Sequence, residues 1–369
     1  KAELQKSVNI VMKAVPAKTT MPILECILID ASTNDIKFTS NDMELGIETR
    51  VQGMVLEKGI IALDAKIFSE IVRKLPDSDV TIETDERLNT TITCEKAKFN
   101  IPGKSGEDFA YLPLIEKNEC IRVSQFTLKE IIRQTIFSIA LNENNKLMTG
   151  ELFQIEDNRL RVISLDGHRI SIRRVPLKEP CEDRKVIVPG KTLNEISKIL
   201  SGELEDMVDI YLSSNHILFE FNDTTVVSRL IEGEYFKIDQ MLSSDYETKV
   251  KINKKEFLDC IDRATLLVKE GDKKPIIINI EDGQMELSID SQIGSMKEDI
   301  DIEKEGKDIM IGFNPKFLID ALKVIDDEEI SIYLMNPKAP CFIRDEAQQY
   351  IYLISRIVAM SFCEPRSCK

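Results

Sequence analysis

The stretch Asp166-Gly167-His168-Arg169 has the residue types that most resemble an active site in this chain. A histidine can act as a general base, and a nearby aspartate can orient its ring. The aspartate, however, recurs with a serine at a spacing of 124 residues, as Ser40 and Asp42, Ser164 and Asp166, and Ser288 and Asp290. An acid present in every copy is more typical of a strand end or an Asx-turn than of catalysis. Only the middle copy has Gly167, His168 and Arg169, which we interpret as a copy-specific binding site.

Other catalytic and nucleotide-binding patterns are missing from the sequence. Ser164-Leu165-Asp166 is not a nucleophile elbow, and there is neither a GxxxxGK[ST] loop nor a GxGxxG after a strand. Gly103-Lys104-Ser105-Gly106 lacks the earlier glycine and a following helix, so we expect a turn there. Two histidines in the whole chain argue against a multi-histidine metal site. We therefore expect no cofactor, no metal and no catalytic residue.

The elements that position this stretch belong to a unit that occurs three times. In the middle copy, Val186–Leu200 reads as an apolar strand, a turn and a helix that opens at Lys191. The same pattern stands 125 residues earlier and 125 residues later. Each helix has an apolar face and a basic–acidic–basic ladder on its polar side. The ladder columns are Lys66, Lys191 and Lys316; Glu70, Glu195 and Asp320; and Arg73, Lys198 and Lys323.

The repeat and the length of 369 residues predict three domains, 1–117, 118–244 and 245–369. Within each, the order helix, strands, helix, strands predicts an α+β fold with two helices packed on antiparallel sheets. In the first copy we expect a helix from Glu3 to about Val15, a strand Ile23–Asp30 and a helix Ala65–Leu75.

The composition bounds the location and the partners. Eight cysteines without a CxxC suit a reducing cytoplasm better than a disulfide framework or a zinc site. The sequence has no run of 18 apolar residues, which a membrane-spanning helix would need. We therefore expect a cytoplasmic protein without membrane contact. The net charge of −15 argues against nucleic acid if charges are evenly spread, because that affinity comes mainly from neutralising phosphates.

The basic columns reverse this argument if they gather on one surface. For one helix, the simpler interpretation is a set of intrahelical pairs such as Lys191, Glu195 and Lys198, worth roughly a few tenths of a kcal/mol each. Three helices in register instead favour one concave basic surface, if the copies surround an axis with helices inward. The first helices of the copies add Lys6, Lys13, Lys129, Arg133, Lys255 and Arg263.

From about Glu3 to Ile354 the chain resembles the bacterial sliding clamps, the beta subunits of DNA polymerase III. The marks that carry the resemblance are Pro22-Ile23-Leu24, placed in the first strand, Asp166-Gly167-His168-Arg169, Val186-Ile187-Val188-Pro189 and Ile311-Gly312-Phe313-Asn314. The resemblance implies three DNA-clamp domains per chain and a homodimer joined head to tail into a ring, helices inside. Such a ring encircles double-stranded DNA without reading its sequence and tethers DNA polymerase and other clamp-binding-motif proteins. A separate ATP-driven clamp loader opens it.

The resemblance also implies site residues. The DNA-facing positions are Lys18, Lys66, Arg73, Lys191, Lys198 and Lys323. The groove for partner peptides is formed by Met148, Leu165, Gly167, His168, Arg169, Ile170, Met241, Leu353 and Ile354. We expect Arg169 to offer hydrogen-bond donors at the groove edge. The family's apolar–Pro–apolar–Arg–apolar tail is replaced by Ser355-Arg356-Ile357 and a continuation through Cys363, so the third domain has an atypical C-terminal tail.

Two other functions fit the residues alone. One is a repeat scaffold that binds proteins and never DNA, which salt-sensitive association with circular DNA would distinguish from a clamp. The other is an enzyme that uses Asp166, His168 and Arg169, which the effect of His168→Ala on turnover or on peptide binding would distinguish.

Overall fold

The computed structural model describes residues 1–142, 144–242, 245–269 and 274–357, which form two compact units. Unit one comprises Lys1–Lys129, Leu177–Cys181 and Val188–Glu232, and unit two comprises the described residues of Glu130–Pro176, Glu182–Ile187 and Gly233–Lys369. These limits differ from the three domains expected from the repeat, so the boundaries at residues 117 and 244 remain predictions. The expected atypical tail lies, from Val358 onward, outside the described residues.

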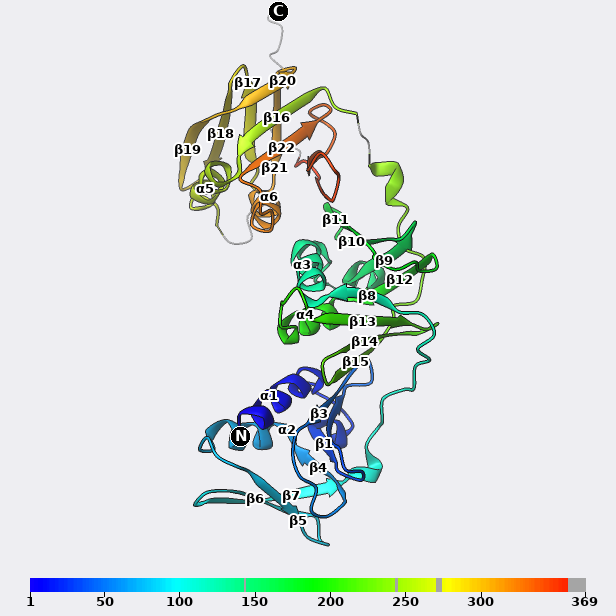
Figure 1. Ribbon diagram of the computed structural model, residues 1–369. Helices are drawn as coiled ribbons and strands as arrows, with labels where there is room; N and C mark the ends of the chain where they lie inside the picture. The colour runs from blue at the N-terminus through cyan, green and yellow to red at the C-terminus, as the bar shows by residue number, and fades with distance from the viewer. Residues whose placement is uncertain (143, 243–244, 270–273, 358–369) are drawn as a thin grey trace, which may run out of the picture. The chain divides into compact units, whose positions relative to one another are not determined.

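Unit one is built on one continuous antiparallel sheet of the order β5-β6-β7-β4-β1-β2-β3-β15-β14-β13-β8. Helices α1 and α2 lie side by side against the first strands (Figure 1). The pairing of β3 with β15 joins the first repeat to the second and sets Ile47 opposite Val226. The elements are α1 (Ala2–Val11), η1 (Met12–Ala14), η2 (Pro22–Glu25), β1 (Cys26–Asp30), β2 (Ile36–Asn41), β3 (Leu45–Val51), β4 (Ile60–Asp64), α2 (Ala65–Lys74), β5 (Thr81–Thr84), β6 (Asn89–Cys94), β7 (Ala97–Ser105), η3 (Gly106–Asp108), β8 (Ile121–Ser124), the start of α3 (Gln125–Thr135), α4 (Gly190–Ile199), β13 (Met207–Leu212), β14 (His216–Phe221) and β15 (Thr224–Arg229).

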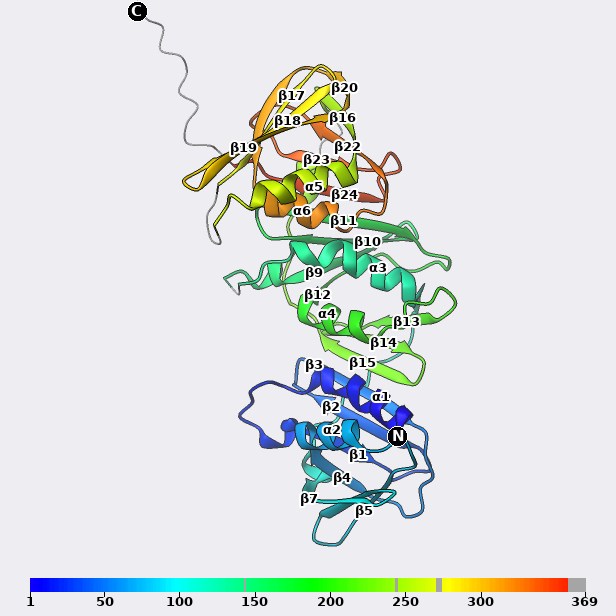
Figure 2. The same ribbon diagram turned by 90° about the vertical axis from the view of Figure 1, so that its left-hand side faces the viewer.

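Unit two contains a nine-stranded antiparallel sheet, β12-β9-β10-β11-β24-β23-β22-β16-β20, and a four-stranded one, β19-β18-β17-β21. Strand β11 pairs with β24, which joins the second repeat to the third and sets Ser171 opposite Tyr352. Helices α5 and α6 lie side by side (Figure 2). The elements are η4 (Ile136–Ser138), η5 (Lys146–Thr149), β9 (Gly150–Glu156), β10 (Arg159–Leu165), β11 (Arg169–Pro176), β12 (Arg184–Pro189), η6 (Ile238–Met241), β16 (Thr248–Asn253), α5 (Lys254–Thr265), β17 (Ile276–Glu281), β18 (Gln284–Ser291), β19 (Gly294–Asp301), β20 (Glu303–Gly306), β21 (Ile309–Phe313), α6 (Pro315–Leu322), β22 (Glu329–Leu334), β23 (Cys341–Arg344) and β24 (Tyr350–Ile354).

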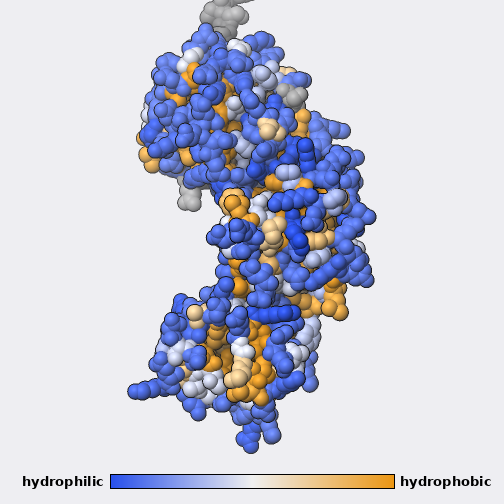
Figure 3. All heavy atoms as spheres, in the orientation of Figure 1, coloured by the Kyte–Doolittle hydropathy of each residue, from blue (hydrophilic) through white to orange (hydrophobic). Residues whose placement is uncertain are grey.

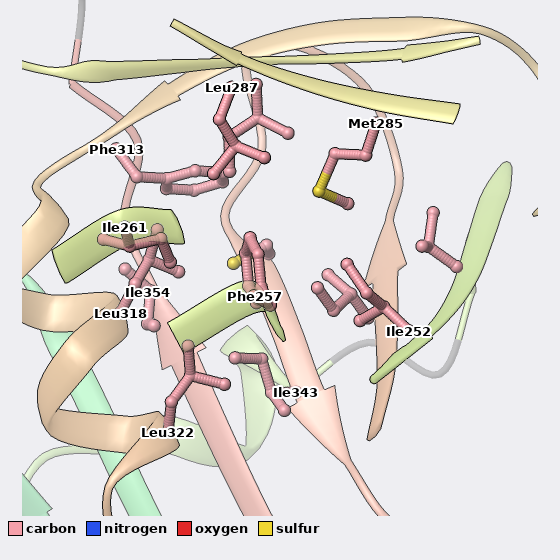
Figure 4. Close-up of a cluster of buried hydrophobic side chains, with 14 of the residues drawn as sticks. Ile252, Phe257, Ile261, Met285, Leu287, Phe313, Leu318, Leu322, Ile343 and Ile354 are labelled. Carbon is pink, nitrogen blue, oxygen red and sulfur yellow. The ribbon is translucent and has the colours of Figure 1, made fainter. Parts of the chain in front are cut away.

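The helices begin where the sequence supplies a capping side chain. Asp64 accepts a hydrogen bond from the backbone N–H of Ile67 (2.8 Å) at the start of α2, and Asn314 accepts one from Lys316 (3.0 Å) at the start of α6. Such a cap stabilises a helix by about 1 kcal/mol. The apolar faces of α5 and α6 then meet the sheets in a dense core, where Phe257 and Leu318 are buried (Figure 4).

Two local predictions are wrong. The predicted strand Ile23–Asp30 begins only at Cys26, because Pro22–Glu25 forms the short helix η2, so Pro22-Ile23-Leu24 does not lie in the first strand. Gly103-Lys104-Ser105 is not a turn but the end of β7, paired with Ile61–Leu63 of β4. Glycine suits this close pairing, since a Cβ on Gly103 would lie 2.6 Å from Cδ1 of Ile61.

The serine–aspartate recurrence is misaligned by one residue in the third copy. The hydroxyls of Ser40 and Ser164 face helices and donate to the carbonyls of Val11 and Thr135. In β18 the helix-facing residue is Ile289, whereas Ser288 points to the other face, because successive strand residues alternate. The equivalents of Ser164 and Asp166 are therefore Ile289 and Ser291, at a spacing of 125 rather than 124.

Candidate functional site

The six predicted DNA-facing side chains are all exposed. They lie in the loop after η1 (Lys18), on α2 (Lys66, Arg73), on α4 (Lys191, Lys198) and at the C-terminal end of α6 (Lys323). Each helix buries its apolar face, so its basic side chains are left on the solvent side. Exposure is the first requirement of a side chain that contacts phosphates.

Half of these cations already have an acidic neighbour. Arg73 pairs with Glu70 (2.5 Å), and Lys198 pairs with Glu195 (2.7 Å), each within one helical turn. Lys191 pairs instead with Asp42 of the β2–β3 turn, which ties the second repeat to the first within unit one. In the described part of the chain, Lys18, Lys66 and Lys323 take part in no ion pair.

Three of the six cations of the first helices are bound within the fold. Lys129 donates to the carbonyl oxygen of Leu200 (3.3 Å) at the end of α4. Arg133 binds Glu130 and Asp326, and Arg263 pairs with Glu298 of β19. Lys129 and these two arginines therefore hold elements together, which the spacing along single helices could not reveal.

The Asp166 turn has the form that the recurrence predicts. One carboxylate oxygen of Asp166 accepts hydrogen bonds from the backbone N–H groups of His168 (2.9 Å) and Arg169 (3.1 Å), which is an Asx-turn. Asp42 accepts from Glu44 (3.0 Å) in the same way, and the Ser291 hydroxyl accepts from Ile293 (3.2 Å) in the third copy. The carboxylate of Asp166 thus orients the backbone rather than the His168 ring.

Arg169 does not lie at an edge where it could offer its donors to a peptide. Its guanidinium donates to the second oxygen of Asp166 (3.0 Å), to Asp320 on α6 (2.6 Å) and to the carbonyl oxygen of Phe137 (2.6 Å). The same group lies over the rings of Phe317 (4.7 Å) and Phe137 (5.3 Å). We conclude that Arg169, with a side chain only 9 % exposed, joins the second repeat to the third inside unit two.

The predicted groove residues divide between the two faces of the sheet. Ile170 lies opposite Leu165 on one side and Leu353 on the other, so these three side chains share one face. Arg169 and Ile354 form the neighbouring pair and point to the helix-covered face, where Ile354 belongs to the α5–α6 core. One face of β10, β11 and β24 therefore provides the apolar surface.

The exposure of the predicted groove residues is uneven. Leu165, Ile170 and Leu353 are buried, whereas Met148 is half-buried and Met241 is 54 % exposed. Gly167, at φ 87°, and His168 are exposed at the turn. The ring of His168 stacks on Phe317 (5.9 Å between centroids), a contact that carries no sequence signal because the two residues are far apart along the chain.

The face of α5 and β19 seen in Figure 3 is mostly hydrophilic with small apolar spots. Among the described residues there is no cluster of three or more His, Cys, Asp or Glu side chains that could hold a metal ion. None of the helices within the described ranges is long and apolar enough to cross a membrane.

Family comparisons match almost the whole chain. Three models of the DNA polymerase III beta subunit match in succession: the N-terminal domain at residues 1–113, the central domain at 122–237 and the C-terminal domain at 239–356. The chain is 34 % identical over 353 residues to the beta sliding clamp of Staphylococcus aureus, which covers 93 % of both proteins. It is 35 % identical over 346 residues to that of Staphylococcus epidermidis, covering 91 % of this chain and 92 % of the relative.

Solved structures agree with these matches. The fold is similar to that of a putative DNA polymerase III beta subunit from Eubacterium rectale, with a TM-score of 0.94, 72 % identity and coverage of 96 % of this chain and 97 % of that one. It is also similar to the DNA polymerase sliding clamp of Bacillus subtilis, with a TM-score of 0.94, 34 % identity and coverage of 97 % of both chains.

Proposed function

The chain belongs to the family of bacterial DNA polymerase III beta subunits, the sliding clamps, and from that premise we propose that two copies close head to tail into a ring around duplex DNA. Its function is that of a DNA sliding clamp in replication, a non-catalytic subunit that works with the DNA polymerase. The ring proposal rests on one observation. Two junctions between repeats are each completed by a pair of strands, and the equivalents of those strands at a third junction each have one open edge among the described strands.

Each complete junction uses equivalent strands. At the first, β3 pairs with β15, and at the second, β11 pairs with β24. The third-copy equivalent of β3 and β11 is β19, which is an edge of its sheet among the described strands. The first-copy equivalent of β15 and β24 is β7, whose residues 97–102 pair with β6 alone. We place β19 of one copy beside β7 of the other.

The internal registers fix which residues would meet. Met296 is the equivalent of Ile47 and Ser171, because all three pair with the helix-facing residue of the preceding strand. Ile47 pairs with Ser40, Ser171 with Ser164 and Met296 with Ile289. Phe99 is the equivalent of Val226 and Tyr352, because the three pair with the buried Ile92, Phe219 and Ile343. Met296 should therefore lie opposite Phe99 of the other copy, and Ser295 opposite Asn100.

Exposed apolar side chains fit the same arrangement. The equivalents of the stacked pair His168 and Phe317 are Ile293 and Ile67, which are 52 % and 50 % exposed in the single chain. A cavity of about 230 Å³ lies beside Ile67 and is lined also by Ile101 and Pro102. A second copy would cover both isoleucines and the open strand edges, which are otherwise an aggregation hazard. Two such contacts close by rotation, so no filament forms.

A disulfide cross-link tests this register. Residues directly opposite in an antiparallel pair have Cα atoms about 4.5–5.5 Å apart, which suits a disulfide. Ser295→Cys combined with Asn100→Cys should give a covalent dimer on mild oxidation, seen as a band of twice the mass without reductant. The control is Ser295→Cys with Lys98→Cys, a diagonal pair of the same face at about 7–8 Å that should cross-link poorly.

The unsubstituted protein, with its eight cysteines, gives the background. Equal cross-linking of the direct and diagonal pairs would overturn the register. A monomeric mass by light scattering at micromolar concentration would overturn the dimer itself.

Within the ring, we assign Lys18, Lys66, Arg73, Lys198 and Lys323 to weak, sequence-independent contacts with phosphates. Arg73, Lys191 and Lys198 contribute less than the other cations, because an acidic side chain already binds each of them. Each exchangeable cation adds little affinity, which allows sliding.

Partner proteins bind, in this proposal, at the apolar face of β10, β11 and β24. Met148, Met241, Gly167 and His168 form the rim, and Leu165, Ile170 and Leu353 form the floor. Arg169 and Ile354 support the floor from the opposite face. A short extended peptide with aliphatic or aromatic anchors suits such a surface at roughly micromolar affinity. DNA polymerase, other clamp-binding-motif proteins and an ATP-driven clamp loader are the expected partners, in the cytoplasm.

A further inference from the structure

Glu151 is a fully buried acid without a partner for its charged form. It lies in β9, has no exposed surface, and neither of its carboxyl oxygens accepts a hydrogen bond. In the part of the chain that the structure describes, no basic group lies within ion-pair distance of it. Burying a carboxylate in this way costs several kcal/mol, so the ionised form does not fit the site.

The surroundings of Glu151 offer a hydrogen-bond acceptor to its carboxyl group when that group is protonated. The β9–β10 register, continued by one residue from Leu152 opposite Ile163, sets Glu151 opposite Ser164 on the helix-facing side. Ser164 donates to the backbone carbonyl of Thr135, whose own hydroxyl donates to the carbonyl of Ile131 (2.7 Å). The hydroxyl oxygen of Thr135 therefore keeps a lone pair, which can accept a hydrogen bond from a protonated Glu151.

Burial raises the pKa of Glu151 to about 8, and the nearby Thr135 hydroxyl, which already donates to Ile131, opposes only part of that rise. The titratable group that faces it is the Tyr235 phenol, which lies 3.5 Å from the Gly150 carbonyl and 3.4 Å from that of Ile163. The pKa of Tyr235 is itself raised, first by burial and then by Glu151, so it stays neutral and supplies no countercharge.

The end of α3 connects this acid to the His168 turn. Thr135 is followed by η4, where the Phe137 carbonyl accepts from Arg169 (2.6 Å). The next residue, Ser138, shares a hydrogen bond with Ser171 of β11 (2.5 Å). A disturbance at Thr135 therefore reaches the residues that hold β11 and its turn.

We propose that Glu151 is a neutral carboxylic acid in the native protein, donating to the Thr135 hydroxyl oxygen, and that its ionisation is a pH-sensitive switch that loosens η4 and the His168 turn. The proton leaves to solvent, and the carboxylate left behind has no donor. This inference concerns unit two alone and does not depend on DNA or on dimer formation.

The sign of the pH dependence follows from linkage. The folded state holds a proton that the unfolded state has lost, so stability is greatest below the ordinary glutamate pKa and falls as pH rises toward about 8. Above that pH the contribution of Glu151 to the free energy of unfolding no longer changes with pH. We therefore compare the unfolding equilibrium constant of the unsubstituted protein with that of Glu151→Gln. The ratio of the first to the second should rise by up to about tenfold per pH unit between about pH 5 and 8. The amide of the variant can donate to Thr135 at every pH.

The experiment compares denaturant unfolding of the full chain from pH 5 to 9 for the unsubstituted protein, Glu151→Gln and the exposed control Glu205→Gln. Hydrogen exchange of the amides at 136–138 and 169–171 reports the local effect and should accelerate with pH in the unsubstituted protein beyond the intrinsic rate. If Glu151→Gln does not fold, infrared spectra of the unsubstituted protein still decide the matter. A protonated-carboxyl band present at pH 6 and lost at pH 9 supports the proposal. Its absence at pH 6, or a Glu151→Gln profile that parallels the unsubstituted one, overturns it.

Discussion

Arg169 accounts for much of the local order around the copy-specific turn. Its guanidinium donates to a carboxylate of its own turn, to Asp320 of the next repeat and to the Phe137 carbonyl. A planar group with several fixed donors suits three acceptors from three segments, and lysine could not replace it. The turn residues that remain available to a ligand are Gly167 and His168.

At the same scale, truncation of the rim tests the peptide-binding face. Met148→Ala and Met241→Ala should each weaken a clamp-binding-motif peptide by about 1–2 kcal/mol, because flexible apolar side chains bury area against its anchors. Fluorescence anisotropy of a labelled peptide measures the change. Met54→Ala, 80 % exposed in unit one, is the matched control and should bind as the unsubstituted protein does. Unchanged binding by the Met148 and Met241 double variant would place the face elsewhere.

At the scale of elements, helices were predictable and some strand positions were not. The 3.6-residue pattern located α2 and the start of α6 to within one residue. The residues of strand β19 give no strand signal, because only Met296 and Ile300 are apolar and the charged residues Lys297, Glu298 and Asp299 follow one another. The apolar run before Cys26 suggested a longer first strand, although Pro22 starts a 3-10 helix there.

The residue types of the candidate site were predictable from the sequence, but the directions in which their side chains point were not. A shift of one residue moves every side chain of a strand to the other face, which is why Ser288 was mistaken for the equivalent of Ser164 and why Ile354 was placed beside Leu353. Long-range partners such as Arg169 with Asp320, or Lys191 with Asp42, leave no trace in local spacing. The sequence could name the cations but not their acidic neighbours.

Charge reversal on two helices tests the proposed DNA-facing surface. Arg73→Glu with Lys198→Glu should impair loading or retention on DNA, because each change removes a cation and leaves Glu70 and Glu195 unopposed. The dimer should persist, since neither residue lies at the proposed contact. Lys58→Glu with Lys185→Glu changes the net charge equally at exposed positions outside the columns and serves as the control. Equal loss in both double variants would mean that net charge, rather than this surface, governs DNA association.

At the scale of the whole molecule, a net charge of −15 and the acidic neighbours of Arg73, Lys191 and Lys198 oppose tight binding to DNA. The ring offers another way to stay on DNA, because a closed protein around a closed circle cannot dissociate without opening. Weak phosphate contacts then assist sliding, whereas strong ones would slow it.

The most direct test of this account is retention on DNA with and without ends. Protein loaded on a nicked circle should remain bound at a salt concentration that abolishes the binding of protein that has not been loaded. Linearising the circle should then release the protein, because the ring slides off the ends. Gel filtration of labelled protein with the DNA measures the bound fraction before and after cutting. Retention on the linear DNA as long as on the circle would contradict encirclement.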